Sequence, residues 1–203
     1  VELQNGYSIS RIIKGGWHLA GGHGAVDEQN AINDMLKFVE AGITTFDCAD
    51  IYTGVEELIG KFLKKHDRAF KAGDLPGVQI HTKYVPDYNA LSSLKMEDTE
   101  RIIDRSLLRL GVEQLDLVQF AWWDYSIPDY IEAAQHLKDL QQKGKIRHIG
   151  ITNFDAKHTT ALLEVGIPII ANQLQYSALD HRPQFDSQVM AEQYDVPFLC
   201  YGS

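Results

Sequence analysis

The sequence predicts an α/β protein of (β/α)₈ TIM-barrel architecture, of which this 203-residue chain contains about seven strands and six helices. The first observation is that short apolar runs typical of strands alternate with amphipathic segments typical of helices along the whole chain. Nearly continuous apolar strands in this alternation indicate parallel strands covered by helices. The second observation is that polar side chains gather at the carboxyl ends of the predicted strands, the face where barrels build their sites.

The first half of the chain contains three predicted strands and three predicted helices. A strand is predicted in SRIIKGGWHLA, and the helix after it has apolar residues at i, i+3, i+4 and i+7 spacing from Ile32 and ends at Gly42. Next come strand TTFDCAD, a helix through EELIGKFLKKH, strand VQIHTKY and a helix that ends at Gly111.

The second half repeats the alternation. Strand LDLVQFAWW is followed by a helix from about Pro128 to Lys143, which Gly144 ends. The remaining elements are strand IRHIGITNF, a short helix through HTTALLEV, strand IIANQLQYS, a helix around SQVMAEQY and strand PFLCYGS. The chain thus stops within or just after a seventh strand.

A doubly wound open sheet is the alternative architecture. It expects a glycine-rich phosphate turn after the first strand, and glycines do occur at positions 21, 22 and 24. Their spacing is not G-x-G-x-x-G, and a flexible loop before a helix explains them as well. The barrel is favoured because polar residues cluster at or near the carboxyl ends of the strands, the face where barrels build their sites. These residues include Asp47, Lys83, Thr152, Asn153, Gln173 and Tyr201.

Composition excludes several classes of function. The net charge is −9 and no basic run opposes it, which argues against nucleic-acid binding. No apolar run reaches the length of a membrane span, so a soluble chain without membrane insertion is expected. Cys48 and Cys200 lie far apart and are expected to be small buried residues in a reducing compartment, the cytoplasm or the stroma or matrix of an organelle. No cluster of His, Cys, Asp and Glu has metal-ligand spacing, so no metal is expected.

Asp47, Tyr52 and Lys83 form the first candidate constellation. Taken separately, Asp47 is explained as a capping or turn residue and Tyr52 as an aromatic residue at the rim. Lys83 changes this interpretation, because it follows an apolar strand and its ammonium would be forced into the mouth of the barrel. An unpaired buried ammonium costs several kcal/mol, so Lys83 needs a carboxylate, and Asp47 on the neighbouring strand supplies one.

These residues belong to longer motifs that occur in one order along the chain: FDCADIY with EELIG, HTKY, LLRLGVEQLDLVQF, GKIRHIGITNF and NQLQYS. With them the sequence resembles the aldo-keto reductases, which are NADP(H)-dependent oxidoreductases with a (β/α)₈ barrel. The resemblance extends over essentially the whole chain. It implies a small-molecule carbonyl substrate and the cofactor NADP(H).

The resemblance also implies roles for individual residues. Tyr52 would be the general acid, Lys83 would lower the pKa of Tyr52, and Asp47 would orient Lys83 and contact the cofactor. The nicotinamide carboxamide would be held by Thr152, Asn153 and Gln173, and its ring would stack on Tyr201. Without the resemblance, Asn153 is explained as a helix cap or turn residue and Gln173 as a buried amide bonded to backbone.

Three tryptophans suggest an apolar, aromatic-walled substrate pocket: Trp17, Trp122 and Trp123. Packing at the barrel rim explains at least one of them equally well.

The fourth strand departs from the family pattern, because Ala121 fills the position of a histidine that bonds the substrate carbonyl oxygen. Loss of activity, a changed substrate and an engineered substitution all remain open as explanations. His18 and His81 are the candidates for a replacement across the barrel, although each is expected to be a rim residue.

The end of the chain is the second departure. The resemblance implies a single barrel domain, of which residues 1–203 would be the first part. Helix 7, strand 8 and helix 8 would complete it and carry the groups for the adenosine 2′-phosphate. Either the chain is a piece of a longer polypeptide or a protein partner covers the open barrel edge.

The sequence leaves two functions open. One is NADPH-dependent reduction of an aldehyde or ketone, impaired or altered by Ala121. The other is a non-catalytic subunit that acts as a cofactor-binding or assembly module, as the β-subunits of potassium channels resemble enzymes while serving a channel.

Overall fold

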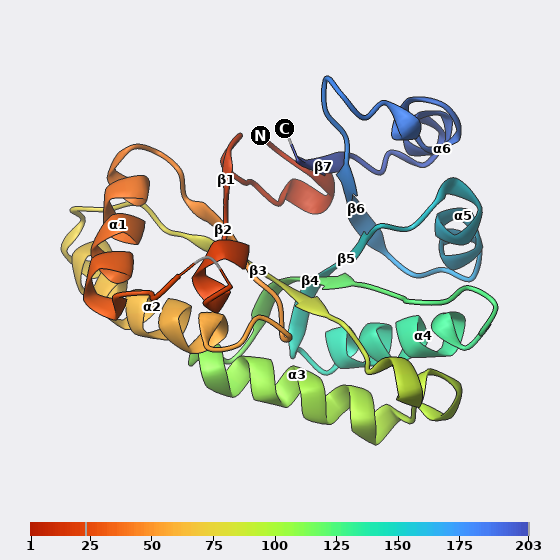
Figure 1. The fold of residues 1–203 in the computed structure, drawn as a ribbon, viewed down its shortest axis with the longest axis horizontal. Helices are drawn as coiled ribbons and strands as arrows, with labels where there is room; N and C mark the ends of the chain where they lie inside the picture. Colours follow the sequence, from red (N-terminus) through yellow and green to blue (C-terminus); the bar gives the residue numbers. More distant parts are fainter. Residues whose placement is uncertain (23, 203) are drawn as a thin grey trace.

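Parallel strands form one curled sheet, in which each strand is hydrogen-bonded to the next one along the chain (Figure 1). The computed structural model describes residues 1–22 and 24–202. Within these ranges the sheet has seven strands: β1 (Ile13–Gly15), β2 (Thr45–Asp47), β3 (Gln79–Tyr84), β4 (Leu115–Phe120), β5 (Ile146–Thr152), β6 (Ile169–Gln175) and β7 (Phe198–Tyr201). The predicted α/β architecture of a partial (β/α)₈ barrel is confirmed.

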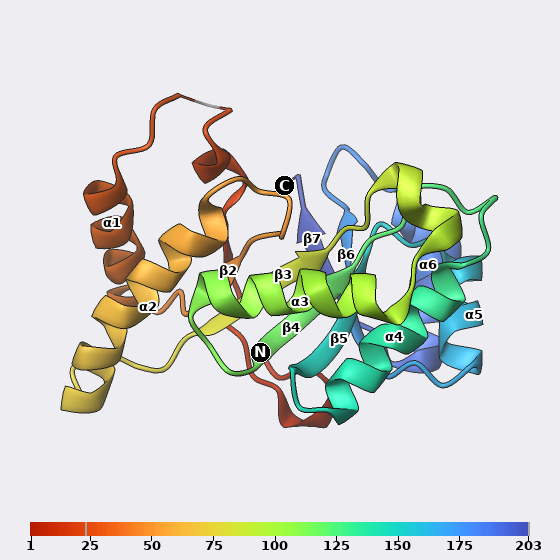
Figure 2. The same ribbon diagram turned by 90° about the horizontal axis from the view of Figure 1, so that it is seen from below.

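The helices lie along the outside of the curled sheet (Figures 1 and 2). In the described part of the chain they are α1 (Glu28–Glu40), α2 (Val55–Ala72), α3 (Met96–Leu110), α4 (Tyr130–Gln142), α5 (Ala156–Glu164) and α6 (Asp186–Tyr194). The predicted stop signals act as expected, since Gly111 ends α3 with a φ of 69°, a left-handed conformation that glycine adopts without strain. None of the helices in these residues is long and apolar enough to cross a membrane.

The first strand is shorter than predicted. Only Ile13–Gly15 pairs with β2, and Trp17–Ala20 forms a 3₁₀ turn instead of continuing the strand. The cause lies at Gly16, whose N–H donates to the carbonyl oxygen of Asp47 at 2.7 Å. A Cβ atom at this position would lie 2.9 Å from that same oxygen, so only glycine fits. The turn that follows brings Trp17 to the carboxyl end of the barrel.

The sheet has apolar packing on both faces. The larger cluster lies between the strands and the helices, and the smaller one fills the inside of the curl. In the smaller cluster the segment 3–9 packs against interior side chains of three strands, namely Leu117, Ile170, Ala171 and Leu199. This segment forms the floor of the barrel, at the end opposite to the predicted site.

Two sequence expectations about buried and exposed residues are wrong. His81 is fully buried, not at the rim, because side chains alternate along β3 and His81 shares the interior face with Lys83. Its Nε2 atom lies 3.1 Å from the Tyr7 hydroxyl, and burial lowers its pKa to about 4. Cys200 is exposed, whereas Cys48 is buried as expected.

An ionic cluster lies on the outer face of the sheet, between β3, α2 and α3. Glu56 is fully buried, and its Oε1 atom accepts a hydrogen bond of 2.7 Å from the Thr82 hydroxyl. Its Oε2 atom accepts a hydrogen bond of 3.3 Å from Arg109. The same guanidinium donates to the carbonyl oxygen of Asp50 at 3.0 Å. Buried carboxylates need such partners, so the loop after β2 is tied to both helices.

The Asp50 side chain belongs to the same cluster. It is 5% exposed, accepts a hydrogen bond of 3.2 Å from the Val85 amide and lies 3.6 Å from an Arg105 nitrogen. Burial first, and then the neighbouring Glu56 carboxylate, raise the pKa of Asp50 to about 7. Between about pH 4 and pH 7 the folded chain therefore holds a proton at Asp50 that the unfolded chain has released.

This difference gives a pH-dependent stability with a defined sign. The free energy of unfolding falls as pH rises through the window, because the folded state binds more protons than the unfolded state. Asp50→Asn retains an acceptor for the Val85 amide and removes the titration. We expect its loss of stability between pH 5 and pH 8 to be smaller than that of the parent by about 2–4 kcal/mol. Denaturant unfolding at both pH values measures this, with Asp34→Asn in the exposed pair with Lys37 as the control. Equal losses in parent and Asp50→Asn would contradict the assignment.

Candidate active site

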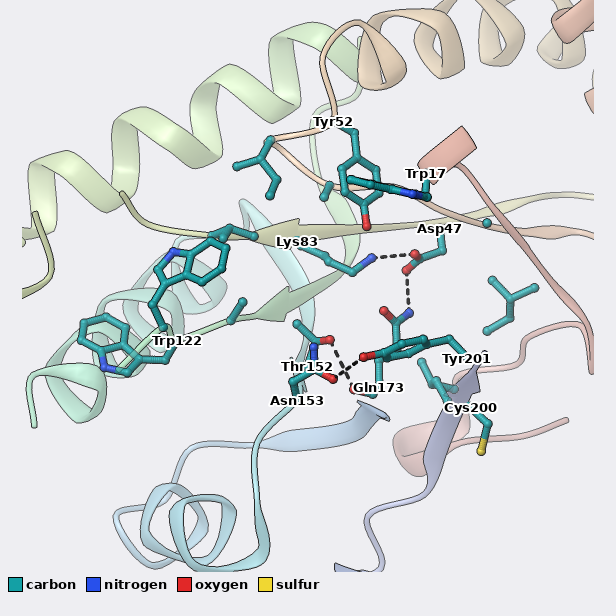
Figure 3. Close-up of a pocket in the computed structure, with 18 residues that line it drawn as sticks. Trp17, Asp47, Tyr52, Lys83, Trp122, Thr152, Asn153, Gln173, Cys200 and Tyr201 are labelled. Atoms are coloured by element: carbon teal, nitrogen blue, oxygen red, sulfur yellow. Dashed lines mark hydrogen bonds and ion pairs between the residues drawn. The ribbon is translucent and has the colours of Figure 1, made fainter. Parts of the chain in front are cut away.

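A cavity of about 530 Å³ opens at the carboxyl ends of the strands (Figure 3). All of the site residues that the sequence predicts line it: Trp17, Asp47, Tyr52, Lys83, Ala121, Trp122, Trp123, Thr152, Asn153, Gln173 and Tyr201. They come from the carboxyl-terminal parts of β2, β3, β5, β6 and β7 and from the loops after β1, β2, β4 and β5. The fold thus brings together residues that lie up to almost the full length of the chain apart.

Lys83 and Asp47 form a buried ion pair in the interior of the sheet. The Lys83 Nζ atom lies 2.5 Å from Asp47 Oδ2 and also donates to the Cys48 carbonyl oxygen at 2.9 Å. The Lys83 and Asp47 side chains are 7% and 12% exposed, so neither charge is well hydrated. The two residues face each other because β2 and β3 are neighbours and Lys83 lies two positions beyond His81, the partner of Asp47 in the register. The pairing expected from the sequence is present.

The second oxygen of Asp47 accepts two amide hydrogen bonds. Gln119 Nε2 donates to Asp47 Oδ1 at 2.6 Å, and Gln173 Nε2 donates to the same atom at 3.0 Å. Gln119 is fully buried, and sequence analysis did not single it out. The signal was its position, since it is a polar residue two positions after Leu117 and therefore on the same, interior face of the strand. Gln173 is the residue that the sequence analysis expects to hold the nicotinamide carboxamide. In the structure one of its two amide hydrogens is already bonded to Asp47.

Tyr52 lies in the loop between β2 and α2, over the ion pair. The Lys83 Nζ atom is 5.4 Å from the centre of the Tyr52 ring, and Figure 3 shows the hydroxyl pointing toward Lys83 and Asp47. The Trp17 ring meets the Tyr52 ring edge-on at 5.1 Å. Burial raises the pKa of Tyr52, and Lys83 opposes this by a smaller amount. The expected net lowering is therefore wrong for this structure, although the lysine acts in the expected direction.

Ala121 follows directly after β4, and its amide donates to the Tyr84 carbonyl oxygen at 3.0 Å. Its methyl group lines the cavity and offers no donor at this point of the wall. Trp123 is 56% exposed and is fixed by a 2.8 Å hydrogen bond from its indole to the Pro86 carbonyl oxygen. Trp122 is only 7% exposed and packs on Phe120. It therefore contributes mainly to the core and only an edge to the cavity.

The opposite wall of the cavity carries the residues assigned to the cofactor (Figure 3). The Tyr201 hydroxyl donates to Asn153 Oδ1 at 2.8 Å, and Thr152 Oγ1 donates to the Gln173 carbonyl oxygen at 3.2 Å. Asn153 has a φ of 58°, a left-handed conformation that asparagine adopts more readily than most residues. The backbone N–H of Asn153 donates to the Gln173 carbonyl oxygen at 2.9 Å, so Asn153 is a turn residue that also lines the cavity. Among residues 1–22 and 24–202 no group of three His, Cys, Asp or Glu side chains could hold a metal ion.

Removal of one member of the ion pair should destabilise the protein strongly. Lys83→Met leaves the Asp47 carboxylate buried without its counter-ion, and we expect a loss of about 3–5 kcal/mol in the free energy of unfolding. The double variant Asp47→Asn/Lys83→Met should regain at least half of this loss, because no unpaired charge remains. Lys37→Met, in an exposed pair, should change stability by less than about 0.5 kcal/mol. A single variant as stable as the parent in urea would show that the pair is hydrated.

Comparison with known proteins agrees with this geometry. The sequence profile described as Aldo/keto reductase family matches residues 11–203. Aldo-keto reductase YhdN of Bacillus subtilis is 29% identical over 204 residues, which cover 98% of this chain and 59% of that protein. An NADH-specific methylglyoxal reductase of Escherichia coli is 31% identical over 189 residues, which cover 85% of this chain and 57% of that protein. The chain thus spans less than three fifths of the length of these two relatives.

Solved structures give the same result for the fold. The thermostable aldo-keto reductase Tm1743, crystallised with the inhibitor epalrestat, has a TM-score of 0.82 and 27% identity over 100% of this chain and 72% of its own. An aldo/keto reductase of Klebsiella pneumoniae, solved with NADP and acetate, has a TM-score of 0.81 and 24% identity over 99% of this chain and 66% of its own. The family profile covers far more than half of the chain. This protein belongs to the aldo/keto reductase family.

Proposed function

We propose that the protein carrying this chain reduces an aldehyde or ketone, with NADPH as the hydride donor and Tyr52 as the general acid. The observation that carries the proposal is the position of Tyr52 over the buried Lys83–Asp47 pair at the wall of a cavity. Relatives with matching sequences include the E. coli methylglyoxal reductase and a D/L-glyceraldehyde reductase of Hypocrea jecorina at 25% identity. Both names describe reduction of small carbonyl compounds.

The reaction needs a proton for the carbonyl oxygen at the moment when its carbon gains a hydride. NADPH, when bound, would supply the hydride and be oxidised to NADP⁺. Tyr52 gives its phenolic proton to the oxygen as negative charge builds there, so that the carbonyl becomes an alcohol. The Lys83 ammonium then faces the new phenolate, which it stabilises in a water-poor site. Asp47 keeps the lysine in place, and protonation of Tyr52 from solvent restores the resting state.

The opposite wall suits a nicotinamide. A carboxamide presents an oxygen acceptor and two N–H donors, and Asn153, Gln173 and Thr152 offer complementary amide and hydroxyl groups on the adjacent ends of β5 and β6. The ring of Tyr201, 40% exposed, is available for stacking. Asp47, which also lines the cavity, would contact the cofactor as well. These groups bond one another in the structure, and this arrangement limits their freedom before the cofactor arrives.

Ala121 limits the expected rate. Loss of one positioned donor or proton-transfer group costs about 10²- to 10⁴-fold. A second function is therefore retained: a non-catalytic subunit with this fold that acts as a cofactor-binding or assembly module. The observation that favours it is the methyl group at position 121, on a cavity wall that otherwise keeps the ion pair and the tyrosine. Cofactor binding and turnover separate these functions.

Calorimetric titration tests whether the cavity wall formed by Thr152, Asn153, Gln173 and Tyr201 binds the cofactor. We expect the protein to bind NADPH in spite of Ala121, and NADH is to be titrated beside it because the E. coli relative is NADH-specific. Asn153→Asp keeps the acceptor for Tyr201 but replaces the amide N–H donors by a negative charge, so affinity should fall about tenfold or more. Asn33→Asp on α1 is the matched control and should leave affinity unchanged. No detectable heat at millimolar NADPH or NADH would favour the assembly role.

Restoring a donor at position 121 tests the proposed reaction. Ala121→His should raise reduction of a simple aromatic aldehyde by about 10² to 10⁴ in kcat, because the imidazole helps most as charge builds in the transition state. Ala121→Leu adds bulk without a donor and should give no gain. Overpacking against Trp122 or Trp123 would cost about 1–3 kcal/mol, so melting temperature is measured together with NADPH oxidation. A folded, NADPH-binding Ala121→His protein that is inactive on a panel of aldehydes would contradict the reductase proposal.

A further inference from the structure

One guanidinium group bonds the chain on both sides of Tyr52. Arg109, near the end of α3, donates from Nη1 to the Asp50 carbonyl oxygen at 3.0 Å and to Glu56 Oε2 at 3.3 Å. Its Nε atom lies 3.0 Å from Glu57 Oε1. Asp50 precedes Tyr52 by two residues, and the two glutamates begin α2 just after it. The arginine thus connects the entry and the exit of the loop that carries the tyrosine.

The other hydrogen bonds of this loop join it to β3 or act within it. The Asp50 amide donates to the Lys83 carbonyl oxygen at 3.3 Å, and the Val85 amide donates to the Asp50 side chain at 3.2 Å. The Tyr52 amide donates to the Ala49 carbonyl oxygen, and the Val55 amide donates to the Tyr52 carbonyl oxygen, each at 3.0 Å. Gly54, with a φ of 76°, makes the turn into α2. The bonds within the loop shape two successive turns. Two arginines of α3 join the loop to that helix: Arg105 lies 3.6 Å from an Asp50 carboxylate oxygen, and Arg109 donates to the Asp50 carbonyl oxygen. Arg109 differs from Arg105 because it also bonds Glu56 and Glu57, which follow Tyr52.

The arginine is itself held firmly against α2. Helices α2 and α3 pack together (Figure 2), and a Cβ atom at Gly60 of α2 would lie 2.4 Å from the Arg109 carbonyl oxygen. Glycine at this position permits the close approach. The Arg109 side chain is 28% exposed, whereas the Glu56 side chain is 1% exposed, so the bond between them is largely shielded from water. A planar guanidinium with fixed donor directions can serve these acceptors together.

We propose that Arg109 is a positioning residue for Tyr52. This inference rests on the proposed function, in which Tyr52 is the proton donor. A proton donor acts only within hydrogen-bonding reach of the oxygen it protonates, and a displacement of about 1 Å can cost about 10²-fold in rate. Arg109 bonds the backbone before Tyr52 and two glutamate side chains after it, and so limits the movement of the Tyr52 hydroxyl over Lys83.

Arg109→Lys tests the proposal because it keeps the positive charge and removes the planar guanidinium, which donates to several acceptors at once. We expect kcat per NADPH-binding site for aldehyde reduction to fall about tenfold or more. The Kd for NADPH should stay within about twofold, because Thr152, Asn153 and Gln173 belong to β5, the loop after it and β6, and Arg109 bonds none of these residues. Hydrogen exchange should rise at the Tyr52 and Val55 amides. Arg101→Lys is the matched control, since Arg101 is on the same helix, is 72% exposed and pairs with Asp98; it should change none of these quantities.

Counting turnover per binding site separates positioning from stability, since a destabilised protein has fewer sites of unchanged kcat. Unchanged kcat per site, or an exchange increase spread over the whole sheet, would overturn the proposal. If the parent reduces no carbonyl compound, the proposed function fails. The positioning role of Arg109 is then decided by local hydrogen exchange around Tyr52: faster exchange in Arg109→Lys supports this role, and unchanged exchange overturns it. Should Arg109→Lys fail to fold, Glu57→Gln weakens only the Nε contact. It should give a smaller fall in kcat per site, of about two- to fivefold, and the same local exchange increase.

Discussion

The site depends on one requirement, which is that the Lys83 ammonium inside the barrel must be neutralised. An unpaired charge there would cost several kcal/mol, so the Asp47 carboxylate has to stay ionised and close. Its two oxygens accept from Lys83, Gln119 and Gln173, on β3, β4 and β6. Four strands, including that of Asp47, thus meet at one carboxylate. A one-residue slip of any of them would turn its polar side chain toward the helices, so the pair also fixes the register of the sheet.

The interior is consequently layered along the barrel axis. The floor is apolar and is closed by the segment 3–9 around Tyr7. Above it lies the polar layer of the ion pair and its two glutamines, and above that the mouth, where Trp17 and Trp123 are more than half exposed. A molecule that enters the cavity from the mouth therefore passes apolar rings before it meets the charged layer. This order suits a ligand whose polar atoms lie at depth and whose apolar groups stay near solvent.

Much of this arrangement follows from local sequence. Alternation of apolar strands and amphipathic helices predicts the half-barrel, and period-2 alternation together with the cost of a buried ammonium predicts that Lys83 meets Asp47. The roles of Tyr52 and Asn153 depended on the family resemblance, because a loop tyrosine and a turn asparagine look ordinary by themselves. Contacts across helices could not be predicted. Glu56 lies in a charged helical stretch that resembles a solvated face, and only packing of α2 on α3 buries it against Arg109.

The direction of the Tyr52 pKa shift was missed for a related reason. A sequence shows that a cation is near, but the amount of water removed from the phenol depends on the enclosing rings, here that of Trp17. The early end of β1 was missed because close backbone approach at Gly16 is a property of two strands together. In each case the decisive quantity is set by a neighbour distant in sequence.

The barrel floor has a consequence for the order of events during synthesis. Segment 3–9 leaves the ribosome long before Ile170 and Leu199, which are among the side chains it packs against. Contacts of such sequence separation close late, because the loop entropy must be overcome before they form. Until then the nascent sheet is open from below, and Lys83 can keep its water shell. Desolvation of the lysine and completion of the floor would therefore coincide, so the charged layer becomes dry only after β6 and β7 have joined the sheet and their side chains are present to compensate it.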